Sequence, residues 1–354
     1  MFNIFSDLYL NLAFWTGVST AALSLFVILS ILWLRWSNLR LKRHEQAFTT
    51  LWRPLLMQAL LGDQGLALPR LRQRDQWLFL KLWNHFQASL RGESIARLRK
   101  MAYQLGCDTA ARRLLKRGNS TERLFAILTL GHMQDPTAWE QLTTQILANN
   151  SRTSLYSAWA LMQIDAGRAA HLVVPQLLQR HDWDIARVAV LLKDFHETLR
   201  TELINKLDPE NTEQLPRALK LAHVMSMQIP PAILLPLLLP TRPVEVLISA
   251  LRLAADAETL VAARGSLSHR DWRVRVQVAH TLGRIGQPED VDRLMTLVQD
   301  KEWWVRYRAA QALADLPFLT QETLLKLRDS LSDRYALEIF RQVFAEHILA
   351  LQQS

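Results

Sequence analysis

The sequence predicts an all-α protein with one N-terminal transmembrane helix, a juxtamembrane helical domain and an α-solenoid. Three observations predict this class. An uncharged stretch runs from Leu8 to Leu34, a strongly basic segment follows it, and a helical unit occurs twice between residues 271 and 313. Self-similarity at a fixed period is typical of repeat architectures, in which each unit packs mainly on its neighbours.

The stretch Leu8–Leu34 exceeds the roughly 20 helical residues that cross a bilayer. No basic residue precedes it and no small-residue cleavage site follows it, so we expect an uncleaved signal anchor and not a removed signal peptide. Trp15 and Trp33 are separated by about 27 Å of helix, which suits the two bilayer interfaces. Residues 1–34 are therefore predicted to be a short external tail and a transmembrane anchor.

Basic residues follow the apolar stretch and do not precede it: Arg35, Arg40, Lys42 and Arg43. The positive-inside rule places this flank and the rest of the chain in the cytoplasm, with the N-terminus outside. The sequence thus predicts a single-pass protein of the inner (cytoplasmic) membrane. Within the stretch, small residues at a spacing of four form a track that would pack against another transmembrane helix: Ala13, Gly17 and Ala21.

Residues 35–118 are predicted to form a basic juxtamembrane domain, because they hold 17 Lys and Arg against 5 Asp and Glu. Pro54 predicts a break, and Asp108 a helix N-cap. Anionic lipid head groups would attract such cations at about 1 kcal/mol each, while the bland interpretation is solvated charge that only sets topology. An acidic protein partner is a third interpretation. Nucleic acid is disfavoured because no DNA- or RNA-binding motif accompanies the charge.

Residues 119–354 are predicted to be the solenoid, ending in a cap over 321–350. Its clearest unit has an apolar stripe at helical spacing: Val274, Val278, Leu282 and Ile285. The small Ala279 would let a neighbouring helix approach, and Gly283 and Gly286 would end the helix before Pro288. In the next unit Val305-Arg306 repeats Val274-Arg275, and Ala310 repeats Ala279.

The pattern D-x(2–4)-V-R-x(3)-A-x(2)-L-G resembles the HEAT repeat, in the short bacterial form associated with phycobilisome-lyase-type proteins. In HEAT repeats the Asp and the Arg of the V-R pair bridge adjacent units, so the resemblance implies that role for Arg275 and Arg306, with ligand contact as the alternative. Membrane-anchored bacterial HEAT proteins further imply a scaffold for protein partners, including a membrane protein, in an envelope polysaccharide or glycosyltransferase assembly.

Weaker copies of the unit precede these two. One contains Ala158 and Leu161, with Ser154 in the position of the repeat arginine. The apolar run Ile229–Pro240 raises a second membrane span, but it holds four prolines and its uncharged run is short. Because prolines suit the first turns of solenoid helices, we expect a buried solenoid helix there.

The repeat period also assigns residues to a concave surface on which a partner would bind. The predicted partner-binding residues are Phe125, His132, Arg152, Tyr156, Trp159, Arg273, Gln277, His280, Arg284, Trp304 and Arg308. They are more aromatic in the early copies and more basic in the late ones. The alternative is that Phe125, Tyr156 and Trp159 pack between repeats.

The sequence predicts neither an enzyme nor a bound cofactor or metal. It has no P-loop, no G-x-G-x-x-G, no H-E-x-x-H and no C-x-x-C, and Cys107 is its single cysteine. HEAT-like deoxyhypusine hydroxylases bind iron through repeated His-Glu pairs, whereas this chain has only His44-Glu45 and His196-Glu197, at unrelated repeat phases. A lyase- or hydroxylase-like HEAT enzyme, or a lipid-surface nucleic-acid binder, are the alternatives to a scaffold.

Overall fold

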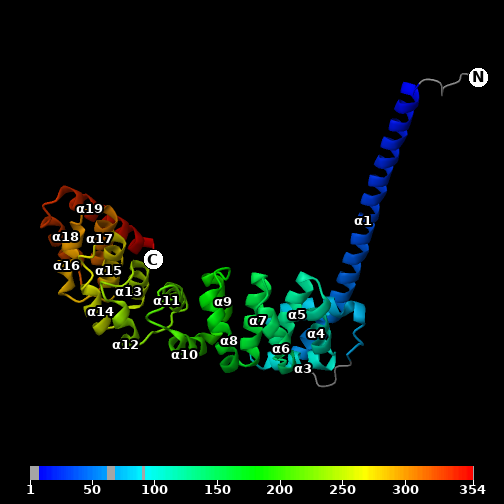
Figure 1. The fold of residues 1–354 in the computed structure, drawn as a ribbon, viewed down its shortest axis with the longest axis horizontal. Helices are drawn as coiled ribbons and strands as arrows, with labels where there is room; N and C mark the ends of the chain where they lie inside the picture. The colour runs from blue at the N-terminus through cyan, green and yellow to red at the C-terminus, as the bar shows by residue number, and fades with distance from the viewer. Residues whose placement is uncertain (1–7, 62–67, 90–91, 354) are drawn as a thin grey trace, which may run out of the picture. The chain divides into compact units, whose positions relative to one another are not determined.

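The computed structural model describes residues 8–61, 68–89 and 92–353, and the all-α class is confirmed (Figure 1). These residues form helices and connecting loops, with no strand among them. The chain divides into two compact units, Met1–Thr144 and Gln145–Ser354. The domain boundaries expected at residues 34 and 118 stay predictions.

The first helix of unit 1, α1 (Leu8–Leu61), is one continuous element, and its described part from Phe14 on has an 18-residue window of mean hydropathy 2.1. This confirms a long apolar N-terminal helix. The break expected at Pro54 is wrong, because the helix runs through it. An internal proline costs about 3 kcal/mol. Here Trp52 and Leu56, on either side of it, are buried, and that burial offsets the cost.

The residues that the sequence assigned to the membrane lie on exposed parts of α1. Gly17 has no neighbour within 4 Å of where a Cβ would stand, and Ala21 is exposed; the Ala13 side chain lies outside the described residues. The four flanking cations Arg35, Arg40, Lys42 and Arg43 are exposed, and the Arg40 guanidinium lies 3.4 Å from the centroid of the Trp36 ring. Helix packing and lipid contact at these positions stay predictions.

The rest of unit 1 consists of η1 (Gln73–Asp75), α2 (Gln76–Ser89), α3 (Glu93–Gln104), α4 (Cys107–Arg117), α5 (Ser120–Met133) and η2 (Pro136–Ala138), and α6 (Trp139–Ile146) crosses the boundary between the units. Helices α2 and α3 pack on α1, and α4 and α5 pack on α2, on α3 and on each other. Buried rings fix α2 on α1, with the centroids of Trp52 and Phe79 4.9 Å apart. Asp108 was expected to be the N-cap of α4, but the N-cap is Gly106. Asp108 lies in the first turn and pairs with Arg112 at 2.7 Å.

Unit 2 is a two-layer stack of helices. The first layer holds α7 (Ser151–Ile164), α9 (Ile185–Leu192), α11 (Leu215–Val224), α13 (Val244–Leu253), α15 (Trp272–Ile285), α17 (Trp303–Asp315) and α19 (Arg334–Gln353). The second layer holds α8 (Ala166–Gln179), α10 (His196–Lys206), α12 (Pro231–Leu234), α14 (Ala257–Arg264), α16 (Asp290–Val298) and α18 (Gln321–Asp329). Successive first-layer helices pack side by side, as the labels from α11 to α17 in Figure 1 show.

Helix α15 illustrates how the repeat sequence produces this packing. The Asp271 carboxylate caps the helix by accepting from the Arg273 amide, and Val274, Val278 and Leu282 are fully buried, which confirms most of the apolar stripe. Such a cap contributes about 1 kcal/mol. Gly283 was expected to end the helix together with Gly286, but it lies inside α15, and only Gly286 is at the end, as the C-cap. A Cβ on Gly283 would stand 2.7 Å from the Cα of Ala312 in α17, so this glycine permits close approach of the two helices.

Arg275 bridges adjacent repeats as expected. Its Nε and Nη2 donate to the two carboxylate oxygens of Asp300 at 2.7 and 2.8 Å, and its Nη1 donates to the His269 carbonyl at 2.7 Å. Both side chains are nearly buried, at 7% and 11% exposure. Burial alone would raise the pKa of Asp300, but the hydrogen bonds from Arg275 hold it below its ordinary value.

The prediction that Arg306 also bridges adjacent repeats is wrong. Its Nη1 donates to the Asp300 carbonyl at 2.9 Å and its guanidinium faces the Tyr335 ring, with no carboxylate partner in the described ranges. The reason is local sequence: Asp300 stands three residues before α17, whereas Leu331 stands three residues before α19. The series of bridges therefore stops where the C-terminal helices begin.

In the repeat that begins with α7, which lacks the arginine, a guanidinium from another position takes its place. Ser154 occupies the arginine position in α7, and Arg180 reaches it from the loop after α8, donating through Nη1 to the Ser154 hydroxyl at 2.8 Å and to the Ala148 carbonyl at 2.9 Å. Arg180 also pairs with Asp182, three residues before α9 and so the counterpart of Asp300. The bridge is kept although the residue that supplies it has changed.

The run Ile229–Pro240 is not one buried helix. It forms the short α12 and η4 (Leu235–Leu237); Ile229, Leu234, Leu237 and Leu238 are buried, and the other positions are half-buried or exposed. Its prolines allow only short helical turns, since each removes a backbone donor. Among the described helices, α1 has the length and composition to cross a membrane.

Candidate functional site: a basic groove in the second unit

A polar column runs across the first layer of unit 2. The ninth residue of four successive helices, α11, α13, α15 and α17, supplies it: His223, Arg252, His280 and Gln311. Arg284 follows His280 by one turn, and Arg308 precedes Gln311 by one turn, so both share this helix face. We name His223, Arg252, His280, Arg284 and Arg308 the basic cluster.

The basic cluster lines a chain of connected hollows, the basic groove. The largest, about 620 Å³, has His223, Arg252 and Arg284 in its wall. Arg284 also lines the next hollow, of about 400 Å³, together with His280 and Arg308. Arg308 continues into a third, of about 260 Å³. Because neighbouring hollows share wall residues, we treat the three as one groove that crosses α11, α13, α15 and α17.

The arginines of the groove differ from many other arginines of unit 2 in their partners. Many of the others pair with a carboxylate: Arg180, Arg200, Arg242, Arg264, Arg273, Arg275 and Arg293. Arg252, Arg284 and Arg308 have no carboxylate partner within the part of the chain that the structure describes. Instead the Arg252 Nε donates to the Gln277 amide oxygen at 3.3 Å, and Arg284 donates to the Ala254 carbonyl. The groove therefore holds three guanidinium groups without a direct carboxylate partner.

Partial desolvation makes this positive charge costly to hold. Burial lowers the pKa of the Arg284 guanidinium below its ordinary value. Burial, and then the positive charges of Arg252 and Arg284, lower the pKa of His223. Burial, and then the charges of Arg308 and Arg284, lower the pKa of His280. The members of the cluster thus repel additional positive charge, and an anion in the groove would relieve that repulsion.

Three carboxylates also line the groove: Asp256 at one end of the cluster, and Asp315 and Glu346 at the other. Asp256 caps α14 by accepting from the Thr259 amide at 3.0 Å. Asp315 lies at the far end, 4.0 Å from a ring nitrogen of His347. The groove is therefore predominantly basic but of mixed sign, and it differs from the uniform positive stripe that a dense polyanion requires.

The late-repeat residues predicted to bind a partner separate into three groups. His280, Arg284 and Arg308 lie together in the groove. Gln277 is only 8% exposed, and its amide oxygen accepts a hydrogen bond from the Arg252 Nε at 3.3 Å. Arg273 and Trp304 lie at the N-terminal ends of their helices and are exposed: Arg273 pairs with Asp271 at 2.9 Å and Glu245 at 2.8 Å, and the ring of Trp304 packs edge-on against Trp303.

The aromatic residues of α7 do not form the exposed patch expected from the period. Trp159 is 7% exposed, so its assignment to an open surface is wrong; Tyr156 is half-buried and Arg152 is exposed. Trp159 is the ninth residue of its helix, the position that carries His223 and Arg252 later in the chain. The same register position is thus buried in one repeat and lines a groove in others.

In unit 1, His132 and Phe125 of α5 contact aromatic residues of α2. His132 is half-buried with its ring 6.2 Å from that of Trp83, and burial, followed by the charge of Arg99, lowers its pKa to about 4. Phe125 packs edge-on against Trp77, with ring centroids 5.0 Å apart. These contacts stabilise unit 1; partner binding at both residues stays a prediction.

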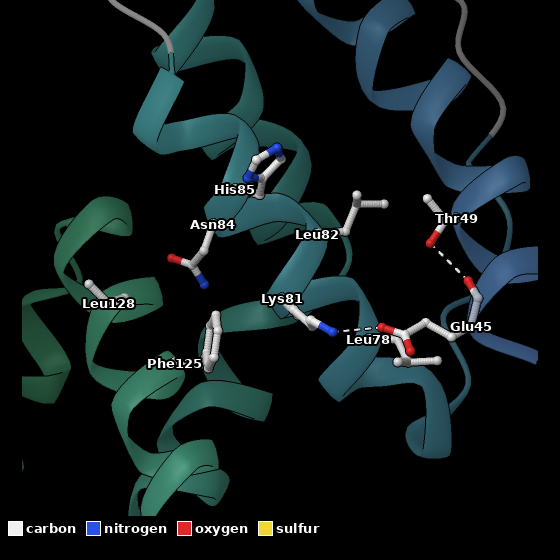
Figure 2. A pocket seen from close by; sticks show the side chains of 9 residues that line it. All are labelled: Glu45, Thr49, Leu78, Lys81, Leu82, Asn84, His85, Phe125 and Leu128. Atoms are coloured by element: carbon white, nitrogen blue, oxygen red, sulfur yellow. Dashed lines mark hydrogen bonds and ion pairs between the residues drawn. The ribbon is translucent and has the colours of Figure 1, made fainter. Parts of the chain in front are cut away.

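Phe125 also lines a hollow of about 390 Å³ in unit 1 (Figure 2). Its walls come from α1, α2 and α5 and are largely apolar, with leucines at 78, 82 and 128. At one side the Lys81 ammonium donates to the Glu45 carboxylate at 2.6 Å, drawn as a dashed line in Figure 2. The hollow is mainly apolar, and its ion pair is neutral as a whole. It therefore has fewer groups than the basic groove that would select a ligand by charge.

Two members of the basic cluster, His223 and Arg252, were missed by sequence reasoning. The repeat register is lost between residues 200 and 255, so the period did not reach them. A usable signal exists: each is the ninth residue of its helix, as His280 is. It depends on knowing where α11 and α13 begin, and neither helix has a side-chain N-cap to mark its start.

The two His-Glu pairs of the sequence occupy ordinary structural contacts. His44 contacts the Asp75 carboxylate at 2.8 Å, and His196 contacts the Lys193 carbonyl at 3.0 Å. Within residues 8–61, 68–89 and 92–353, no three side chains of His, Cys, Asp or Glu are grouped as a metal site would need.

A comparison with protein families agrees with the helical repeats of unit 2. Residues 235–338 match a protein-family model described as HEAT repeats, and the matched part carries the core of the basic groove. Among solved structures, human deoxyhypusine hydroxylase in complex with glycerol is similar at 15% identity and a TM-score of 0.28, with 77% of this chain and 97% of that chain covered. A comparison with curated proteins found no match.

Proposed function

We propose that this protein is a membrane-anchored HEAT-repeat scaffold that binds protein partners and catalyses no reaction. HEAT repeats commonly mediate protein–protein interactions, and stacked helix pairs present extended binding surfaces. The observation that carries the proposal is the basic groove, because three arginines without carboxylate partners line it. Guanidinium groups are well suited to bind partner carboxylates through paired hydrogen bonds.

The proposal places unit 2 at the cytoplasmic face of a bacterial inner membrane. Helix α1 is long and apolar enough to cross a bilayer, and four exposed cations follow its apolar part. A scaffold of this layout would keep a cytoplasmic segment of its partner close to the bilayer. An envelope polysaccharide or glycosyltransferase assembly is the narrower setting that we propose for it.

Topology reporters test the anchoring. A reporter active only in the cytoplasm, fused after Ser354, is expected to be active, and one active only outside the membrane is expected to be silent, because the cations after residue 34 hold that flank inside. Replacing Arg35, Arg40, Lys42 and Arg43 with Gln should weaken this preference. The opposite reporter pattern in the unaltered chain would rule out a cytoplasmic scaffold.

Photo-crosslinking in cells tests partner binding. A photo-crosslinking amino acid in place of His280, which is exposed in the groove, should join the chain to a discrete protein partner. The matched control is the same amino acid in place of Val261, which is 62% exposed on α14 in the second layer. Equal crosslinking from both positions, or none from position 280, would contradict binding in the groove.

A further inference from the structure

We infer that the basic groove binds an extended acidic segment of the partner, with carboxylates about three residues apart. This inference rests on the proposed function and specifies the chemistry of its ligand. The juxtaposition that carries it is that of Arg252, Arg284 and Arg308, which come from three successive helices and line connected hollows.

Desolvation explains why the groove requires an anion. A half-buried guanidinium has lost part of its hydration, and carboxylate partners compensate Arg275 and Arg264 for that loss, as in the pairs with Asp300 and Asp290 at 2.7 and 2.8 Å. Arg284 is more exposed than these two, but burial still lowers the pKa of its guanidinium, which donates to the Ala254 carbonyl. A carboxylate brought by a ligand would supply the missing partner and accept two parallel hydrogen bonds.

Helix spacing sets the spacing of the ligand charges. Packed helices lie about 8–10 Å apart, and Arg252, Arg284 and Arg308 lie on consecutive first-layer helices. An extended chain in the polyproline II conformation has three residues per turn and rises about 3.1 Å per residue, so every third side chain points the same way and three residues cover one helix-to-helix step. A segment with Asp or Glu at every third position would therefore offer one carboxylate to each arginine.

The mixed sign of the groove favours a peptide over nucleic acid or an anionic polysaccharide. Asp256 and Asp315 line the same hollows as the arginines and would repel a polymer with closely spaced charges. Between its acidic residues a peptide carries backbone amides, which can donate to these carboxylates. The wall of the largest hollow also includes Met227, Ile229 and Leu253, which would contact apolar side chains of such a segment.

Fluorescence anisotropy of labelled peptides on the purified full chain in neutral detergent tests the inference. The probe is a 12-residue peptide with Glu at every third position, and its comparators carry Gln at those positions or the same Glu residues clustered at one end. The spaced acidic peptide should bind at least about tenfold more tightly than the Gln peptide, because only its carboxylates can accept charge-assisted hydrogen bonds from the arginines. It should also bind more tightly than the clustered peptide.

Variants of the chain locate the binding. Arg284→Gln and Arg252→Gln should each weaken binding of the spaced peptide by about tenfold or more. Arg334→Gln is the matched control, because it removes one exposed positive charge on α19, outside the residues that line the groove, and it should leave the affinity unchanged. A charge exchange provides a positive test: Arg284→Glu should recover affinity for a peptide in which one Glu is replaced by Lys.

Several results would overturn the inference. These are equal binding of the Glu and Gln peptides, equal loss in Arg334→Gln and Arg284→Gln, or tighter binding of a single-stranded oligonucleotide or a polyglucuronate than of the peptide. The inference can fail alone: a partner crosslinked at position 280 without acidic-peptide binding would keep the scaffold and reject its acidic ligand. Loss of both the crosslink and the peptide binding would reject the proposed function as well.

Discussion

Arg275→Ala is expected to lower the free energy of unfolding by about 3–5 kcal/mol, because it leaves the nearly buried Asp300 carboxylate without its partner. The substitution also removes the donor to the His269 carbonyl in the loop before α15. Chemical unfolding of the full chain in neutral detergent, followed by helical circular dichroism, measures the change. The double variant Arg275→Ala/Asp300→Ala should recover part of the loss, since no uncompensated charge then remains.

Arg273→Ala is the matched control for this prediction. Arg273 lies two residues away on the same helix and pairs with Asp271 and Glu245, but it is exposed. Surface ion pairs contribute little, so we expect almost no change in unfolding free energy. Equal effects of Arg273→Ala and Arg275→Ala would show that the buried bridge is not what holds the two repeats together.

Acid should reduce the effect of Arg275→Ala. In the unaltered chain the pKa of Asp300 is below its ordinary value, so its ionised form stabilises the fold above about pH 4, and this stabilisation is lost as pH falls through the folded-state pKa. Without Arg275, burial alone would raise that pKa, and protonation would remove the uncompensated charge. The difference in stability between the two proteins should therefore shrink as pH falls toward 4.

Trp159→Ala is expected to destabilise the protein by about 3–5 kcal/mol, the cost typical of removing a large buried aromatic side chain. The structure places this ring at 7% exposure in α7. The loss arises from lost apolar burial and from the cavity that remains. A thermal melt of the full chain in detergent, compared with the unaltered protein, measures it.

Trp304→Ala is the matched control, since it removes the same side chain at 57% exposure. We expect its melting temperature to stay close to that of the unaltered protein. An unchanged melt for Trp159→Ala together with loss of partner capture would instead restore Trp159 to an open binding surface.

The repeat pattern alone predicted the packing residues of unit 2 where it was strongest. The steps of three and four between Val274, Val278 and Leu282 are a property of one helix, and all three side chains are buried as expected. The bridge from Arg275 followed from the resemblance to HEAT repeats, because it depends on residue types at fixed positions. His280, Arg284 and Arg308 were likewise placed on one face by period.

Tertiary contacts decided what the period could not. A register position fixes which way a side chain points from its own helix, but its exposure depends on what neighbouring segments cover. The ninth helix position is therefore buried at Trp159 and lines a groove at Arg252. Gly283 shows the same limit: its sequence context suggests a helix end, whereas the close approach of Ala312 from α17 explains the absence of a side chain.

The sequence by itself determined the apolar N-terminal helix, the all-α class and the basic character of the late repeats, because each depends on composition or on local periodicity. Only the tertiary structure placed His223 and Arg252 in the same groove as Arg284 and Arg308. The helices that carry His223 and Arg252 begin without a side-chain cap, and no fixed period links these residues to the later ones. It also decided which arginines have carboxylate partners. That distinction depends on distances of a few ångströms between side chains far apart in the chain, which no local pattern specifies.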